Sequence, residues 1–232
     1  MPLKRWIKSA NFAIEGILHG TKTQRHLRYH LYSAAGILIL CYILGISRND
    51  FLIIAIMVIV VLVAELFNTA IETMVDILSP GQSEEARIAK DVAAGAVLTT
   101  ALGAAVIGYI ILMPYIRKGF QTGFRIAKHS GEDISIMAVI LVLILVVITK
   151  AYLGKGTPFR GGIPSGHSAL AFSLWVGVSY TTGNAFASIL SFALAAVIAA
   201  SRVTSRIHTV WEVVLGGAIG ASLTFLLFQI FS

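Results

Sequence analysis

Long apolar runs separated by short polar stretches dominate the chain. A helix needs about 20 apolar residues to cross the hydrocarbon core of a bilayer, and fewer when flanking polar side chains reach the surface. The runs predict seven membrane-spanning helices, at residues 31–46, 51–75, 91–116, 134–150, 168–182, 185–201 and 210–231. Within the last run, Gly216 and Gly220 form a GxxxG pair, which predicts close packing against another helix. The pattern is that of an all-α integral membrane protein.

The first 28 residues follow a different pattern. Apolar side chains recur there at three- and four-residue steps beside basic ones, namely Trp6, Ile7, Ala10, Ile14, Ile17 and Leu18. This periodicity predicts an amphipathic helix that lies on the membrane surface. The basic start leads into a mixed segment rather than an apolar core, so we expect no cleavable signal peptide.

Composition excludes the soluble classes. The 232 residues are 57% hydrophobic and only 12% charged, with a mean hydropathy of +0.85, whereas a soluble globular domain carries about 25% charged residues. Much of the net charge of +7 precedes the first apolar run, where basic residues set orientation and contact anionic lipids. We therefore expect a membrane and no nucleic acid as partner. The single cysteine, Cys41, excludes a disulfide within one chain.

The clearest boundary is the polar and basic stretch 117–133. It separates residues 1–116, with three predicted spans, from residues 134–232, with four. Because the polar motifs of the two parts are unrelated, we interpret the chain as two fused modules joined by a basic linker. With the basic N-terminus inside, all but five of the 18 Lys and Arg residues lie on the cytoplasmic side. The polar loops of both modules then face the cytoplasm.

The second predicted span carries a stripe of polar side chains. Glu65, Asn68, Glu72 and Asp76 follow one another at intervals of 3, 4 and 4 residues, which places them within about 80° of one helix face. Ionisable groups inside a membrane are candidate functional residues, and carboxylate and amide oxygens suit a hard cation. The alternative is a buried polar network that fixes helix packing.

Four segments of the first module carry a resemblance. NFAIEGI, RYH, AELFNTAIETMVD and AKDVAAGAV, within residues 5–116, resemble the prokaryotic diacylglycerol kinase and undecaprenol kinase family. The resemblance implies a three-span lipid kinase that uses ATP and Mg²⁺ and forms a homotrimer. It makes Glu72 a magnesium ligand and Glu65 the base on the lipid hydroxyl. It also implies that Asn68, Lys90 and Asp91 hold the nucleotide.

The first module departs from this family at one metal-binding position. The family carries a glutamate that contributes to metal binding where this chain has Gln24, followed by His26. A neutral amide is a weaker magnesium ligand than a carboxylate. Two expectations follow: a slow kinase in which Gln24 or another group completes the metal site, or a module that serves only as a scaffold.

Three polar islands interrupt the second module. They lie at residues 150–162, at the PSGH sequence of 164–167, and at 201–212, and hold two histidines and five basic residues, Lys150, Lys155, Arg160, Arg202 and Arg206. Basic side chains and the free amides of a helix start suit a phosphate dianion. His208 and Glu212 stand at i and i+4, so the carboxylate can orient the imidazole. The alternative is a set of ordinary basic loops with incidental histidines.

These islands resemble the type 2 phosphatidic acid phosphatase superfamily. The resemblance covers residues 134–232 and implies a mechanism without a metal or other cofactor, in which His208 attacks phosphorus, Glu212 raises its basicity and His167 protonates the leaving group. It further implies that the phosphate is bound by Lys150, Ser165, Gly166 and Arg202.

The second module departs from its family in three respects. Thr157 stands where the first motif has an arginine, and we expect Arg160 to substitute for it. Glu212 replaces an aspartate, and the module has four predicted spans where the family commonly has six.

Together the resemblances predict an enzyme of lipid phosphate metabolism in the bacterial cytoplasmic membrane. We expect a phosphatase for undecaprenyl diphosphate, joined to a module that phosphorylates undecaprenol or diacylglycerol. One alternative is a phosphatase for phosphatidic acid or phosphatidylglycerophosphate with a degenerate kinase scaffold. Another is a non-catalytic protein that binds or transports lipid.

Overall fold

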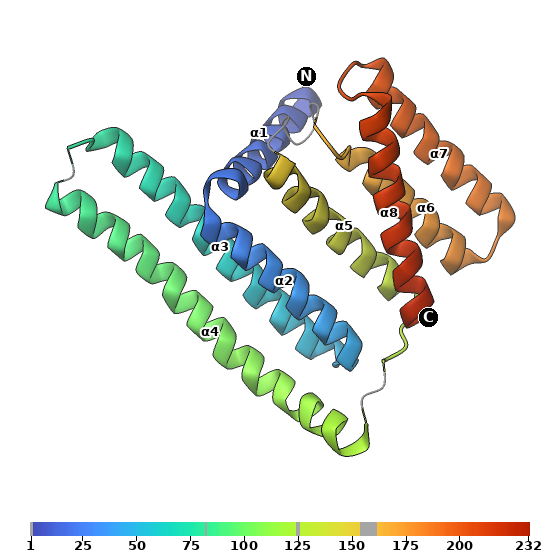
Figure 1. The fold of residues 1–232 in the computed structure, drawn as a ribbon, viewed down its shortest axis with the longest axis horizontal. Coiled ribbons are helices and arrows are strands. Elements are labelled where there is room, and N and C mark those ends of the chain that lie inside the picture. Colours follow the sequence, from blue (N-terminus) through green and yellow to red (C-terminus); the bar gives the residue numbers. More distant parts are fainter. Residues whose placement is uncertain (1, 82, 124–125, 154–161) are drawn as a thin grey trace. The chain divides into compact units, whose positions relative to one another are not determined.

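The computed structural model describes residues 2–81, 83–123, 126–153 and 162–232. In these ranges the chain forms α-helices and no strand (Figure 1). The helices are α1 (Pro2–Thr23), α2 (Arg25–Leu44), α3 (Arg48–Leu78), α4 (Glu84–Thr122), α5 (Gly131–Leu153), α6 (Gly166–Thr182), α7 (Ala185–Thr204) and α8 (Val210–Phe231). The predicted all-α membrane architecture is confirmed.

Six of the described helices are long and apolar enough to cross a membrane: α2, α3, α4, α5, α7 and α8. The seventh predicted span corresponds to α6, which has only 17 residues and is shorter than the others. The predicted surface helix of the first 28 residues is interrupted, because α1 ends at Thr23 and α2 begins at Arg25. The chain is a multi-pass membrane protein.

The contacts divide the chain into two compact units. Residues 23–127, with α2, α3 and α4, form the three-helix unit, and residues 1–22 and 128–232, with α1 and α5 to α8, form the five-helix unit. The expected modules placed the first 22 residues with the first part of the chain, whereas the contacts group them with the second. The expected linker 117–133 is partly helical, since α4 continues to Thr122 and α5 begins at Gly131.

In the three-helix unit, a tight turn joins α2 to α3. Gly45 adopts a left-handed conformation, with φ of 58°, and its N–H donates to the carbonyls of Cys41 and Tyr42. A Cβ at Gly45 would lie 2.5 Å from the Cβ of Ala127. Glycine is therefore required there both by backbone conformation and by space.

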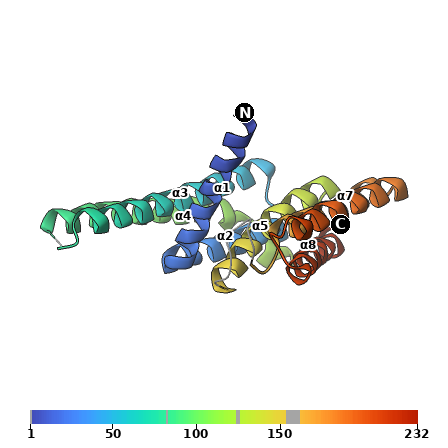
Figure 2. The ribbon, with the colours of Figure 1, turned by 90° about the horizontal axis from the view of Figure 1, so that it is seen from above.

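The long helices α3 and α4 run side by side as an antiparallel hairpin (Figures 1 and 2). Serine caps start both helices: Ser47 Oγ accepts the Asp50 N–H, and Ser83 Oγ accepts the Ala86 N–H. Such caps satisfy amides that have no partner within the helix. The hairpin places the polar stripe of α3 near the loop end of the unit.

In the five-helix unit, α6 packs against α5, α7 and α8. A Cβ on Gly216 would lie 2.3 Å from the Ser165 carbonyl oxygen, and one on Gly220 would lie 1.9 Å from that of Ala169. The backbones of α6 and α8 approach this closely only because both positions are glycine, which confirms the predicted role of the GxxxG pair. This contact fixes the start of α6 against the start of α8.

Candidate active sites

A capping box fixes the start of α8 and one histidine beside it. Thr209 Oγ1 accepts the Glu212 N–H at 3.3 Å, and Glu212 Oε2 accepts the Thr209 N–H at 3.1 Å. The same carboxylate oxygen lies 2.8 Å from His208 Nδ1. Because an ionised carboxylate only accepts hydrogen bonds, Nδ1 carries the proton in the neutral imidazole. The lone pair of His208 is then on Nε2.

His208 Nε2 has the position expected of a nucleophile. The side chain is 0% exposed, and within the described ranges Nε2 has no hydrogen-bond partner. A buried polar nitrogen without a partner is costly. An unpaired lone pair on an imidazole oriented by a carboxylate is the arrangement that nucleophilic or acid–base catalysis needs.

Positive groups from two other helices, α5 and α7, act on this imidazole. Lys150, near the end of α5, is only 1% exposed, and the charges of Lys150 and Arg202 reach both His208 and His167. Burial lowers the pKa of His208 below its ordinary value; the hydrogen bond to Glu212 opposes this shift and the two cations reinforce it. His208 is therefore neutral, and able to attack, at neutral pH.

The PSGH segment is attached directly to α8. The Ser165 N–H donates to the Glu212 carbonyl at 3.0 Å, and Ser165 is fully buried. Its hydroxyl makes no capping bond to α6 and instead accepts from Ser168 Oγ at 3.1 Å. The amides that open α6, beginning at Gly166, therefore receive no bond from this side chain and can bind an anion.

The end of α7 sets the place of His208. The Arg202 carbonyl accepts the N–H groups of both Ile207 and His208 at 3.1 Å, and Arg206 between them adopts a positive φ of 52°. The chain thus folds back on the last turn of α7. This brings the Arg202 and His208 segments together.

The structure brings together the predicted residues of the second module, which are Lys150, Ser165, Gly166, His167, Arg202, His208 and Glu212. Arg160 and Thr157 lie outside the described residues, so the substitution of one for the other stays a prediction. Sequence reasoning missed Thr209, whose Thr-x-x-Glu spacing is a capping-box signal. It also missed the Gly162 amide, which donates a hydrogen bond to the Glu212 carboxylate. No pattern of residues in the sequence indicates this bond.

A second polar cluster lies in the three-helix unit. Glu65 and Asn68 are buried, at 3% and 8% exposure. Asn68 Nδ2 donates to Glu72 Oε1 at 3.0 Å, and Gln24 Nε2 donates to Glu72 Oε2 at 3.4 Å. The charges of His26 and His30 reach Glu65. The Glu65 and Glu72 carboxylates of α3 thus lie near polar groups of α2 and near Gln24, the residue that precedes α2.

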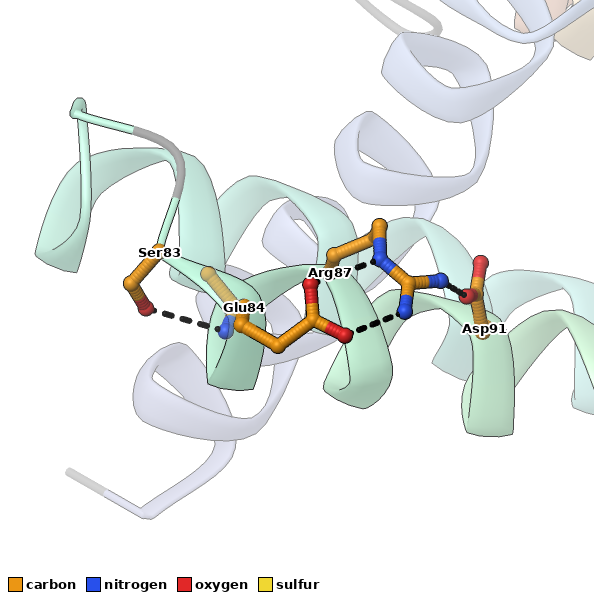
Figure 3. A network of polar contacts seen from close by, with 5 residues as sticks. Ser83, Glu84, Arg87 and Asp91 are labelled. Carbon is orange, nitrogen blue, oxygen red and sulfur yellow. Dashed lines mark hydrogen bonds and ion pairs between the residues drawn. The ribbon is translucent and has the colours of Figure 1, made fainter.

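Lys90 and Asp91, the predicted nucleotide ligands, are paired with opposite charges. Lys90 forms an ion pair with Asp76, and Asp91 accepts from Arg87 at 2.6 Å. Figure 3 shows Arg87 between Asp91 and Glu84 in the first turns of α4. These ion pairs are exposed and contribute little to stability, so a nucleotide can exchange them at small cost.

The carboxylate and amide oxygens around Glu72 are of the type that binds a magnesium ion. Among the described residues, no group of three or more His, Cys, Asp or Glu side chains is placed to hold a metal. However, Mg²⁺ is usually bound through one or two carboxylates together with substrate phosphates and water. Asn68 Oδ1 is buried and has no hydrogen-bond partner in the described structure, so it is an available oxygen beside Glu72. The Gln24 amide offers its oxygen after a 180° rotation.

The three-helix unit also holds an apolar cavity of about 760 Å³. Side chains of α2, α3 and α4 line it, among them Ile37, Val61, Leu62 and Ala105. His30, whose charge reaches Glu65, is one of its few polar lining residues. The volume is in the range of small-molecule sites, and the apolar lining suits a hydrocarbon chain.

Comparison with known proteins gives two family matches along the chain. The prokaryotic diacylglycerol kinase model matches residues 11–112, and the PAP2 superfamily model matches residues 99–232. No solved structure matches the chain.

Two curated relatives match the first half. An undecaprenol kinase of Bacillus subtilis is 35% identical over 112 residues, which cover 48% of this chain and 91% of that protein. A diacylglycerol kinase of Synechocystis sp. is 37% identical over 108 residues, 46% of this chain. The matched part spans 61% of the Synechocystis protein. The chain is thus a membrane protein in which a member of the prokaryotic diacylglycerol kinase family is fused to a member of the PAP2 superfamily.

Proposed function

We propose that the five-helix unit is a metal-independent lipid phosphatase that works through a phosphohistidine. The observation that carries the proposal is the His208 imidazole, held at Nδ1 by Glu212 while the buried Nε2 lacks a partner in the described structure. Lys150 and Arg202 supply positive charge beside it. A nucleophile among fixed cations and open helix amides suits a phosphoryl group.

In the first step, His208 Nε2 attacks phosphorus and forms a P–N bond. Burial and the neighbouring cations lower the pKa of His167 to about 4 in the absence of substrate, and the negative charge of the bound phosphate group raises it again, so that His167 takes up a proton when the lipid binds. The bond between phosphorus and the bridging oxygen then breaks, and protonated His167 gives its proton to that oxygen. Glu212 stabilises the imidazolium character that develops on His208. Lys150, Arg202 and the first amides of α6 bind the phosphoryl oxygens, whose charge they neutralise.

In the second step, water hydrolyses the phosphohistidine. Neutral His167 takes a proton from the water, whose oxygen bonds to phosphorus while the P–N bond breaks. Inorganic phosphate leaves, His208 recovers its lone pair and His167 its proton. Both groups return to their starting states, so the cycle needs no metal or redox partner.

We propose undecaprenyl diphosphate as the substrate, with phosphatidic acid as the alternative. The Bacillus subtilis relative of the first half is an undecaprenol kinase. A kinase for undecaprenol and a phosphatase for its diphosphate would yield the same product, undecaprenyl phosphate. A kinase and a phosphatase acting on one lipid would instead only hydrolyse ATP.

The test is phosphate release from both lipids by purified protein in excess EDTA. Wild type, His208→Ala and Glu212→Gln are compared. We expect release by wild type, none by His208→Ala, and a large decrease for Glu212→Gln because the tautomer of His208 is no longer fixed. Release that EDTA abolishes, or that survives in His208→Ala, would contradict the proposal. The faster lipid identifies the substrate class.

A second function, lipid phosphorylation by the three-helix unit, is favoured by the buried oxygen of Asn68 beside Glu72 and by the apolar cavity. We propose that Glu72, Asn68 and Gln24 hold Mg²⁺, and that Lys90 and Asp91 bind the nucleotide. Mg²⁺ neutralises charge on the phosphoryl oxygens when bound. Glu65 accepts the proton of the lipid hydroxyl, and the cavity holds the lipid chain.

The kinase is tested by transfer of labelled phosphate from ATP to undecaprenol and to diacylglycerol. We expect transfer that needs Mg²⁺ and is lost in Glu72→Ala, with phosphatase activity unchanged in that variant. Absence of transfer to either lipid by folded protein would instead favour a scaffold role.

We propose a homotrimer, as in the first family. Native mass spectrometry in detergent tests it, and a monomer would contradict it.

A further inference from the structure

The serine that precedes α6 does not cap its helix in the usual way. Ser47, Ser83 and Thr209, which precede α3, α4 and α8, each accept the N–H of the residue three positions on, the ordinary bond of an N-cap. Ser165 makes no such bond, although Ser168 stands at the corresponding position. Instead, the side-chain hydroxyl of Ser168 donates to Ser165 Oγ at 3.1 Å. The hydroxyl of Ser168 has thus taken the place of its own N–H.

Both hydroxyl groups are buried on a backbone that is fixed in place. Ser165 and Ser168 are each 0% exposed. The Ser165 N–H donates to the Glu212 carbonyl, and the Ser165 carbonyl accepts the Ala169 N–H, both at 3.0 Å. Because these bonds hold the backbone, rotation of the Ser165 side chain decides whether its oxygen accepts the hydroxyl or the N–H of Ser168.

This choice leaves donors available at the start of α6. A serine hydroxyl carries one proton, and that of Ser165 has no acceptor among the described residues, because Ser165 Oγ accepts from Ser168. The Ser168 N–H is likewise not taken by the Ser165 side chain. A buried donor without an acceptor is costly, and donors at a helix start suit a phosphate group. Both donors belong to the segment that is bonded to Glu212, the residue whose carboxylate holds His208.

We propose that Ser168 is a positioning residue of the phosphatase site. By donating to Ser165 Oγ, its hydroxyl keeps the Ser165 side chain from capping α6. The Ser165 proton and the first amides of α6 then stay available to the phosphate oxygens of the lipid. The Ser168 hydroxyl acts through Ser165 and does not itself contact the lipid. The inference rests on the proposed phosphatase function and adds to it a residue that follows the PSGH sequence.

The test measures phosphate release from undecaprenyl diphosphate in excess EDTA, with inorganic phosphate as a competitive inhibitor. In Ser168→Ala the Ser165 oxygen turns to the N–H of residue 168 and caps α6. We expect KM and the inhibition constant of phosphate to rise about three- to tenfold, as for loss of a hydrogen bond, while the unfolding temperature does not fall. Ser168→Cys, with its weak thiol donor, should lie between wild type and Ser168→Ala. The control Ser173→Ala removes another buried hydroxyl of α6, which contacts Thr224 at 2.7 Å, and should keep both constants.

A double-mutant cycle with Ser165→Ala tests whether Ser168 acts through Ser165. Added to Ser165→Ala, the change Ser168→Ala should alter either constant by less than about twofold. An equal rise with and without Ser165, or constants for Ser168→Ala that match those of Ser173→Ala, would overturn the role of Ser168. A lower unfolding temperature with a loss of kcat at unchanged KM would show a structural role and overturn it too. If His208→Ala still releases phosphate, the phosphatase proposal itself fails.

Discussion

Replacing Gly216 by alanine tests whether the contact between α6 and α8 sets the geometry of the phosphatase site. The new Cβ would lie 2.3 Å from the Ser165 carbonyl oxygen, whereas carbon and oxygen ordinarily approach to about 3.3 Å. The start of α6 must therefore move by about 1 Å. Ser165 is also the residue whose N–H donates to the Glu212 carbonyl at 3.0 Å, so the phosphate-binding amides move away from His208.

The size of the effect follows from this displacement. Overpacking of this kind costs about 1–3 kcal/mol of stability, and a misplacement of about 1 Å at a catalytic site can cost about 100-fold in rate. We expect Gly216→Ala to fold with a lower unfolding temperature and to lose about 100-fold in kcat/KM for phosphate release. Transfer of phosphate by the kinase should not change.

Gly217→Ala is the matched control. Its Cβ would lie 3.0 Å from the ring of Phe172, a side chain that can shift by a few tenths of an ångström. We expect its activity to stay within severalfold of wild type. The assay is phosphate release in EDTA, with thermal unfolding measured in the same detergent. Full activity of Gly216→Ala, or an equal loss in both variants, would refute the argument that the Ser165–Gly216 contact positions the site.

Three further predictions concern pH, the metal site and the orientation in the membrane. Because burial holds the pKa of His208 below 6.5, and protonation removes the attacking lone pair, the acidic limb of phosphatase kcat/KM should be centred below that value, and the need for a protonated His167 should make kcat/KM decline as the pH rises; an acidic limb centred above pH 6.5 would contradict this. Gln24→Glu should strengthen magnesium binding, because a carboxylate is the better ligand, and should lower the Mg²⁺ concentration that half-activates the kinase; an unchanged Mg²⁺ dependence would exclude Gln24 as a ligand. In a Cys41→Ser background, an impermeant maleimide should label Asn49→Cys on intact cells and Ser205→Cys only after permeabilisation; the reverse pattern would place the phosphatase loop outside.

The helices could be predicted from the sequence because apolar runs of membrane length have few other structures available to them. Their ends were less predictable. The α4 helix continues to Thr122, past the apolar run, since Arg117, Lys118 and Gln121 are good helix formers in any solvent. Hydropathy gives the extent of the membrane segment, whereas the helix ends where its backbone loses favourable partners.

The contact between His208 and Glu212 was also predictable from their spacing. The two side chains lie 2.8 Å apart, although His208 precedes the Thr209 cap and lies outside α8, so the capping box rather than helical geometry places the carboxylate beside it. Contacts between helices were not. The pairing of Lys90 with Asp76 depends on how α3 and α4 approach, and the bond from the Ser165 N–H to the Glu212 carbonyl depends on how α6 and α8 pack. Neither can be read from periodicity, which reports only which face of a helix is apolar.

The covalent intermediate tests the central claim most directly. Protein is mixed in EDTA with undecaprenyl diphosphate labelled at its terminal phosphate, quenched rapidly in alkali and digested for mass spectrometry. The account predicts a labelled, acid-labile phosphohistidine on the peptide that contains His208, and none in His208→Ala. Phosphate release by wild type without a labelled peptide, or with the label on another residue, would contradict it.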